Sequence, residues 1–351
     1  CATAARRAGR GRRGSTCSPP GEPMPASGGA RVGVLLVHGM GNPTASFAVP
    51  LVERLVRALA PDDARVAFEA CYWADLLQGQ QDRTWARLQR KPMRHERARR
   101  WIVGTLGDPV SYLAGYLRQG EPAYAAVHAR LRARLVDLAR RVGGDAPLVV
   151  LAHSLGGVVA SNYVWDEQRR HGAVHPHARR ATPGAPTTGA HPAPGVGAHG
   201  PASAGETPME RMETLAALVT YGCSIPLFLP PSPPIECIRF PPPTLAPRLR
   251  AVATWLNVYD PDDLLGYPIG DVWDVTHGTT ITDVPLEVGG ALVGWTPWVH
   301  TRYDTDAGFV ALVRDVIARV LAALDDGDGS DDGDGIAAPP AHPPLEPFDG
   351  R

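Results

Sequence analysis

Residues 148–157 read LVVLAHSLGG, an apolar run that ends in a small-residue turn around Ser154. The run LVVLA has the composition of a strand buried on both faces, as in a parallel sheet. Residues 155–170 then carry apolar side chains at helical spacing. We therefore predict a strand, a sharp turn and a helix, in the order found in parallel α/β sheets.

Strand and helix patterns alternate on both sides of this unit, across residues 30–324. We expect strands at 32–37, 66–72, 148–152, 215–221, 252–259 and 280–284, and helices at 47–59, up to 141, at 155–170 and at 307–324. Such alternation predicts one α/β domain with a mostly parallel central sheet of about six strands and helices on both faces.

Four segments depart from this pattern. Residues 1–29, the Pro/Gly-rich insertion 171–208 and the acidic, Pro-rich tail 325–351 contain few large apolar side chains, so we expect all three to be disordered. Residues 74–107 are polar and rich in arginine, and we expect them to form a cap-like insertion.

Composition and charge exclude several classes of protein. The net charge of −1 in 351 residues gives no basis for nucleic-acid binding. No uninterrupted apolar run reaches 18 residues, and the opening segment lacks the apolar core of a secretory signal. The five cysteines show neither zinc-site spacing nor disulfide density: Cys1, Cys17, Cys71, Cys223 and Cys237. We therefore expect a cytoplasmic protein in a reducing compartment.

Ser154 is the candidate nucleophile. It stands where a strand turns sharply into a helix, as the nucleophile-elbow motif requires. Such a turn brings two backbones together, so small residues are needed two positions away on each side, and Ala152 and Gly156 meet that need. Ala152 replaces the glycine that usually opens the motif, and Gly157 extends its small-residue end.

A second glycine-rich turn follows the first expected strand and reads His38-Gly39-Met40-Gly41. Acyl transfer requires backbone N–H groups directed at the developing oxyanion, and glycine lets the backbone approach. We predict that the oxyanion hole consists of the N–H groups of Met40 and Leu155.

A serine nucleophile needs a general base. His300 follows the last expected strand and precedes the closing helix, which favours it as the base. His277 is the competitor, but it precedes that strand. His153, inside the serine turn, is interpreted as a packing or supporting residue.

The base in turn needs a carboxylate, which should lie between the serine and the histidine in the chain. Residues 257–268 read NVYDPDDLLGYP and offer three aspartates. We select Asp263 because apolar residues follow it and can fold beneath it. Asp260 is the alternative acid, and Asp262 is the third candidate.

The motifs HGMG, AHSLGG, LVTYGCSIPLF, DPDDLLGYP and WVHTRYDTD together resemble the α/β-hydrolase superfamily, especially its lipase-like and GPI inositol-deacylase-like bacterial members. The resemblance covers roughly residues 31 to 324. It implies a sheet of eight strands in its full form, and hydrolysis of an ester, thioester or amide through an acyl-enzyme. It also implies a serine hydrolase of the carboxylesterase or lipase type (EC 3.1.1), without metal or organic cofactor.

Two other functions stay open at this point. One is a non-catalytic scaffold with the same fold. The other is a peripheral lipid-binding protein that contacts a membrane surface through the Arg-rich residues 83–100, with Trp85 and Trp101. The expected partner is a small-molecule or lipid ester, and no obligate protein partner is inferred. The histidines at 171, 175 and 177 lie in the Pro/Gly-rich insertion and are not expected to bind a metal.

Overall fold

A computed structural model describes residues 29–41, 43–91, 122–172, 205–229, 234–289 and 298–328, together with several positions between 93 and 112. It contains one six-stranded sheet in the order β2-β1-β3-β4-β5-β6, and every neighbouring pair is parallel. The strands are β1 (Val32–Val37), β2 (Val66–Cys71), β3 (Leu148–His153), β4 (Leu215–Tyr221), β5 (Thr254–Tyr259) and β6 (Ile281–Pro285).

The central strands are buried on both faces, which explains their continuous apolar composition. Successive side chains of a strand point to opposite faces. In β3, Leu148 and Val150 therefore pack into one apolar cluster and Val149 and Leu151 into another. The sheet thus separates two hydrophobic cores.

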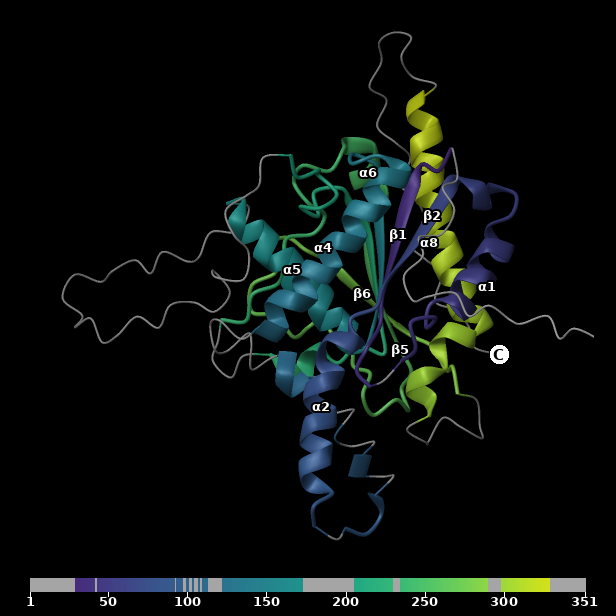
Figure 1. The fold of residues 1–351 in the computed structure, drawn as a ribbon. Coiled ribbons are helices and arrows are strands. Elements are labelled where there is room, and N and C mark those ends of the chain that lie inside the picture. Colours follow the sequence, from purple (N-terminus) through teal and green to yellow (C-terminus); the bar gives the residue numbers. More distant parts are fainter. Residues whose placement is uncertain are drawn as a thin grey trace, which may run out of the picture.

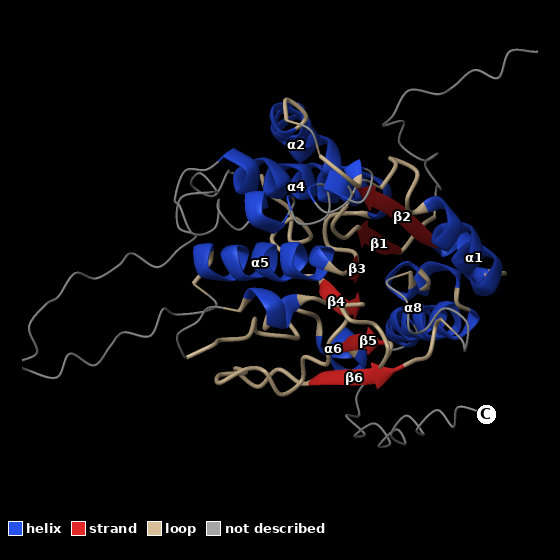
Figure 2. Ribbon diagram, turned by 90° about the horizontal axis from the view of Figure 1, so that it is seen from below, coloured by secondary structure: helices blue, strands red, loops and turns tan. Residues whose placement is uncertain are grey.

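Helices cover both faces of the sheet (Figures 1 and 2). One face carries α4 (Pro122–Val142) and α5 (Leu155–Arg170), and the other carries α1 (Val49–Leu59), α6 (Pro247–Val252) and α8 (Ala307–Asp328). The helix α2 (Ala74–Leu88) projects from the body of the molecule (Figure 1). Short 3-10 helices complete the described elements: η1 (Asp62–Arg65), η2 (Ile225–Phe228), η3 (Val299–Thr301) and η4 (Tyr303–Thr305).

The strand order reverses between β1 and β3. After β1 the chain passes to β2 on one side, then returns to β3 on the other side and continues outward to β6. The loops that follow β1 and β3 therefore lead to helices on opposite faces, α1 and α5. Ligand sites of open α/β sheets form at such a switch point, beyond the carboxyl ends of the strands.

The structure confirms the predicted α/β architecture and the parallel sheet of six strands. Several boundaries differ by a few residues: α1 begins at Val49, where Pro50 occupies an early helical position, and α8 continues to Asp328. Within the insertion expected at 171–208, residues 205–208 are described, and Glu206 forms ion pairs with Arg132 and Arg170. Residues 1–28, 173–204 and 329–351 of the expected disordered segments lie outside the described residues.

No helix in the described ranges combines the length and the apolar content that a membrane crossing requires. The cysteines that the structure describes, Cys71, Cys223 and Cys237, are buried and form no disulfide.

Candidate active site

Ser154 lies directly between β3 and α5 in a backbone conformation that side chains rarely adopt. Its φ is 53° and its ψ is −124°. A non-glycine residue at positive φ is strained, and such strain persists only where the surroundings hold it in place. Here the N–H of Ser154 donates to the carbonyl of Tyr221 at 2.9 Å, and its carbonyl accepts from Gly157 at 2.9 Å. The strand on one side and the helix on the other thus fix the serine.

Two glycines allow the backbones around Ser154 to approach. A Cβ atom on Gly156 would lie 2.5 Å from the carbonyl oxygen of Val37, at the end of β1. A Cβ atom on Gly39 would lie 2.6 Å from the Cβ of Ser154. Any larger residue at either position would push the β1 loop away from the serine turn.

Ser154, His300 and Asp263 form one continuous hydrogen-bonded array. The distance from Ser154 Oγ to His300 Nε2 is 2.8 Å. His300 Nδ1 lies 2.8 Å and 3.1 Å from the two carboxylate oxygens of Asp263. All three side chains are buried. A proton on Nδ1 that is donated to Asp263 leaves Nε2 free to accept the serine proton, which is the tautomer that a general base needs.

The surroundings of Asp263 favour its ionised form. Burial by itself would raise the pKa of this carboxyl, but hydrogen bonding and charge from His300, the N–H of Leu265 and the hydroxyl of Tyr303 together lower it below its usual value. The Leu265 N–H donates to Oδ1 at 3.0 Å, and the Tyr303 hydroxyl donates to Oδ2 at 3.0 Å. A buried carboxylate that accepts several hydrogen bonds is a stable anion beside the imidazole.

The other predicted acids occupy different places. Asp260, the alternative acid, is buried, and its carboxylate accepts from the N–H groups of Asp262, Val288 and Gly289 at 2.9, 2.7 and 3.3 Å. It therefore ties the loop after β5 to the chain that leaves β6. Asp262 is exposed.

His277, the competing base, lies in the segment that precedes β6. Its Nε2 is 3.4 Å from Glu236 Oε2. His300 is the histidine that the structure places against Ser154 Oγ.

His38 holds the glycine-rich turn against the start of α2. Its Nε2 accepts from the N–H groups of Trp73 and Ala74 at 3.0 and 3.3 Å, so the ring proton resides on Nδ1 and is donated to the Gly39 carbonyl at 2.7 Å. Burial lowers the pKa of His38 to about 4, which keeps the ring neutral at pH 7. The ring also stacks on Trp73, with centroids 4.5 Å apart.

The residues whose backbone N–H groups are predicted for the oxyanion belong to the two segments that meet at Ser154. Leu155 is the first residue of α5, and the first N–H groups of a helix have no partner within the helix. Met40 follows Gly39, whose α-carbon lies against Ser154. Helix termini of this kind attract negative charge.

His153 and Tyr303 are supporting residues around this array. The ring of His153 stacks on that of Tyr221, with centroids 5.0 Å apart. The hydrogen bond of Tyr303 to Asp263 was not expected from the sequence. The available signal was proximity in the chain, since Tyr303 follows His300 by three residues.

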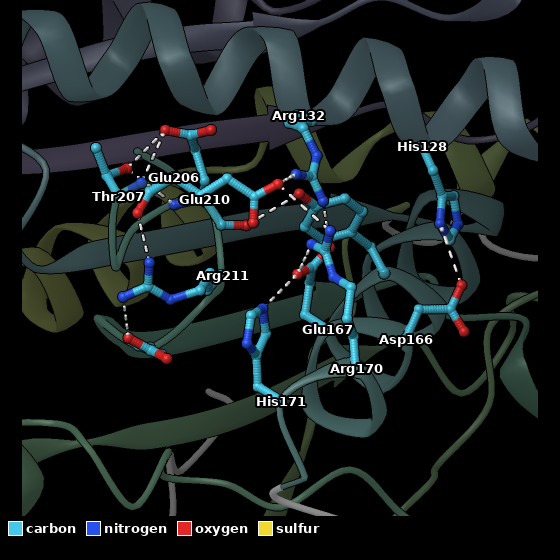
Figure 3. A network of polar contacts seen from close by, with 12 residues as sticks. His128, Arg132, Asp166, Glu167, Arg170, His171, Glu206, Thr207, Glu210 and Arg211 are labelled. Carbon is cyan, nitrogen blue, oxygen red and sulfur yellow. Dashed lines mark hydrogen bonds and ion pairs between the residues drawn. The ribbon is translucent and has the colours of Figure 1, made fainter. Parts of the chain in front are cut away.

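A second polar cluster lies between α4, α5 and the chain that enters β4 (Figure 3). Glu167, His171 and Glu206 are close enough to hold a metal ion, with ligand atoms within 4.8 Å of one another. However, Arg132 and Arg170 form ion pairs with both carboxylates. A cation would have to displace these guanidinium groups. The histidines at 175 and 177 lie outside the described residues.

Comparison with known proteins adds no relative: no protein-family model, no curated protein and no solved structure matches this chain. The class that the structure itself defines is an α/β protein with a single parallel six-stranded sheet and a Ser–His–Asp array. The serine of that array follows β3, next to the point where the strand order reverses.

Proposed function

We propose that this chain is a serine hydrolase of the α/β-hydrolase type that cleaves a carboxylic ester. The observation that carries the proposal is the continuous array from Ser154 Oγ through His300 to Asp263, with the serine in a strained turn at φ 53°. The chain order serine, acid, histidine is that of α/β-hydrolases. The parallel sheet supports the same fold, because each of the three residues follows the carboxyl end of a different strand.

The reaction follows from the geometry. Ser154 Oγ attacks the ester carbonyl while His300 Nε2 takes the hydroxyl proton. The N–H groups of Met40 and Leu155 stabilise the oxyanion of the tetrahedral intermediate. His300 then returns the proton to the leaving alkoxide as the ester bond breaks, and water hydrolyses the acyl-enzyme with His300 again as the base.

Exposed apolar side chains favour an apolar acyl or lipid ester over a polar one. Leu227 follows β4, Leu264 follows Asp263 and Trp298 precedes His300, and each is at least half exposed. Since all three lie in segments that carry or adjoin the site, we propose that they guide an apolar substrate. We also propose that α2 and the stretch after Gly222 line the acyl pocket.

Labelling with a small fluorophosphonate tests the nucleophile. Ser154→Ala should abolish labelling, because the probe reacts with an activated serine hydroxyl. Ser161→Ala is the matched control: Ser161 is also a buried serine of this region, and its hydroxyl donates to the Gly157 carbonyl at 2.7 Å. This control should label as the wild type does. p-Nitrophenyl esters of increasing chain length should then reveal an optimum that measures the pocket.

Failure of folded wild-type protein both to label and to hydrolyse these esters would exclude the proposal and favour a non-catalytic scaffold. Membrane contact is tested separately by co-sedimentation with vesicles that contain anionic lipid. Binding that weakens as salt rises would indicate the Arg-rich residues of the α2 region as a lipid-binding surface.

A further inference from the structure

We propose that Tyr303 is a positioning residue of the site, which holds the Asp263 carboxylate toward His300 and moderates its charge. This proposal rests on the proposed function. It assigns a role to a residue that does not touch the reacting atoms and that acts only through Asp263.

The Tyr303 hydroxyl forms two hydrogen bonds with the loop that bears Asp263. The hydroxyl donates to Asp263 Oδ2 at 3.0 Å and accepts from the N–H of Asp260 at 2.8 Å. The accepted bond comes from the same loop that bears Asp263, so the hydroxyl is oriented by that loop before it donates. Tyr303 is fully buried, and burial, with the nearby charge of Asp263, raises the pKa of its phenol. The group therefore stays protonated and remains a donor.

Local structure explains why the tyrosine and the histidine reach the same carboxylate. His300 lies in η3 and Tyr303 begins η4, three residues later. The two turns follow one another directly, so both side chains start from the same short segment. Both donors bond Asp263 Oδ2, at 2.8 Å from His300 Nδ1 and 3.0 Å from the Tyr303 hydroxyl.

The tyrosine ring is itself fixed by packing. Its centroid lies 5.8 Å from that of Tyr221 and 6.2 Å from that of Phe309, within the core between the sheet and α8. The hydroxyl therefore has little freedom to leave the carboxylate. On the other side, the Leu265 N–H holds Oδ1 at 3.0 Å. The two donors together define the plane of the Asp263 carboxylate.

The direction in which removal of the Tyr303 hydroxyl should change the pH dependence of the reaction follows from charge. A donor to Oδ2 offsets part of the negative charge that stabilises the His300 imidazolium. In Tyr303→Phe that charge is less compensated, so its attraction for the imidazolium that forms during the reaction is stronger. The acid limb of the activity profile should therefore move to higher pH.

The test is the rate of fluorophosphonate labelling as a function of pH for wild type, Tyr303→Phe and Tyr163→Phe. Tyr163 is the matched control because it is also fully buried and donates its hydroxyl to a backbone carbonyl, that of Glu210, at 2.9 Å. For Tyr303→Phe we expect roughly a tenfold lower rate at the optimum, since small displacements of a reacting group reduce rates by such factors. We also expect the acid limb of its profile to move to higher pH. Tyr163→Phe should show neither change.

NMR titration of the His300 ring gives a readout that does not need activity. If the titration of the His300 ring changes in Tyr303→Phe but not in Tyr163→Phe, the positioning role of Tyr303 is supported. This holds even if the wild-type protein fails to label, because failure to label would exclude only the hydrolase function. Unchanged titration together with an unchanged acid limb in folded Tyr303→Phe overturns the role of Tyr303. A rate loss that both variants share, without movement of the acid limb, also overturns it.

Discussion

His153 Nε2 donates a hydrogen bond to the carbonyl oxygen of His300 at 2.8 Å, and the two rings lie 4.7 Å apart. Burial, with the neighbouring His300, lowers the pKa of His153 to about 3, so this ring is neutral at pH 7. The residue that precedes the candidate nucleophile therefore holds the backbone of the candidate base. The serine turn and the histidine turn are joined directly.

Replacement of His153 by phenylalanine should remove the hydrogen bond that joins these two turns. The ring contacts persist, but the His300 carbonyl loses its donor, which we expect to lower the free energy of unfolding by about 1 kcal/mol. The rate of labelling should fall roughly tenfold, because His300 is less well oriented toward Ser154. His153→Gln provides a donor at similar reach and should recover part of the rate. If the phenylalanine variant labels at the wild-type rate, His153 does not have this role.

Three aspartate variants distinguish the acid from its neighbours. Asp263→Asn should reduce ester hydrolysis by roughly 10⁴-fold, the loss expected when the base is left in the wrong tautomer. Asp260→Asn should retain most activity but lower the free energy of unfolding by about 1–3 kcal/mol, because an amide cannot accept all three backbone N–H groups. Asp262→Asn, at an exposed position, should match the wild type in both assays. Loss of activity in Asp260→Asn alone would transfer the role to Asp260.

Asp304 should make stability depend on pH. Burial raises its pKa from 3.8 to about 6, against a hydrogen bond from Tyr221 that lowers it. The folded state therefore binds more protons than the unfolded state between about pH 4 and 6, so stability should fall as pH rises through this window. The loss is on the order of 3 kcal/mol, since each unit of pKa difference corresponds to about 1.4 kcal/mol.

Asp304→Asn should remove that slope, and the variant should be more stable than the wild type at pH 8 but not at pH 4. Urea unfolding between pH 4 and pH 8 measures the free energy of unfolding of both proteins. Asp315→Asn, on the exposed side of α8, is the control and should keep the wild-type slope. Parallel curves for wild type and Asp304→Asn would refute the prediction.

The arginine–glutamate cluster of Figure 3 should be structural. Glu167 is fully buried and pairs with Arg132 at 2.6 Å and with Arg170. Glu167→Gln should lower the free energy of unfolding by about 3 kcal/mol, because two guanidinium groups lose their shared anion. Asp137→Asn, which breaks more exposed pairs, should cost less than about 1 kcal/mol.

Divalent cations and EDTA should leave the unfolding midpoint of the wild type unchanged, because guanidinium groups engage both carboxylates of this cluster. A midpoint that rises with a divalent cation would instead reveal a metal site at Glu167, His171 and Glu206.

The strands and the serine turn could be predicted because their signals are local. A continuous apolar run predicts a strand buried on both faces, and the small residues Ala152 and Gly156 predict a tight turn. The choice among Asp260, Asp262 and Asp263 depended on weaker reasoning, since all three lie in one short loop. The ion pairs of Glu206 with Arg132 and Arg170 could not be predicted, because these partners are distant from it in the sequence.

The sequence by itself determined the alternation of strands and helices, and which residue types are available at the ends of the strands. Only the tertiary structure decided which of them meet. The parallel register brings the ends of β3, β4 and β5 to one edge, so His153, Tyr221 and Val258 lie side by side, although 105 positions separate the first from the last. The hydrogen bonds of Asp263 to His300 and Tyr303 depend on where the segment that contains η3 and η4 docks. That docking is set by packing and burial in three dimensions, which a one-dimensional pattern does not encode.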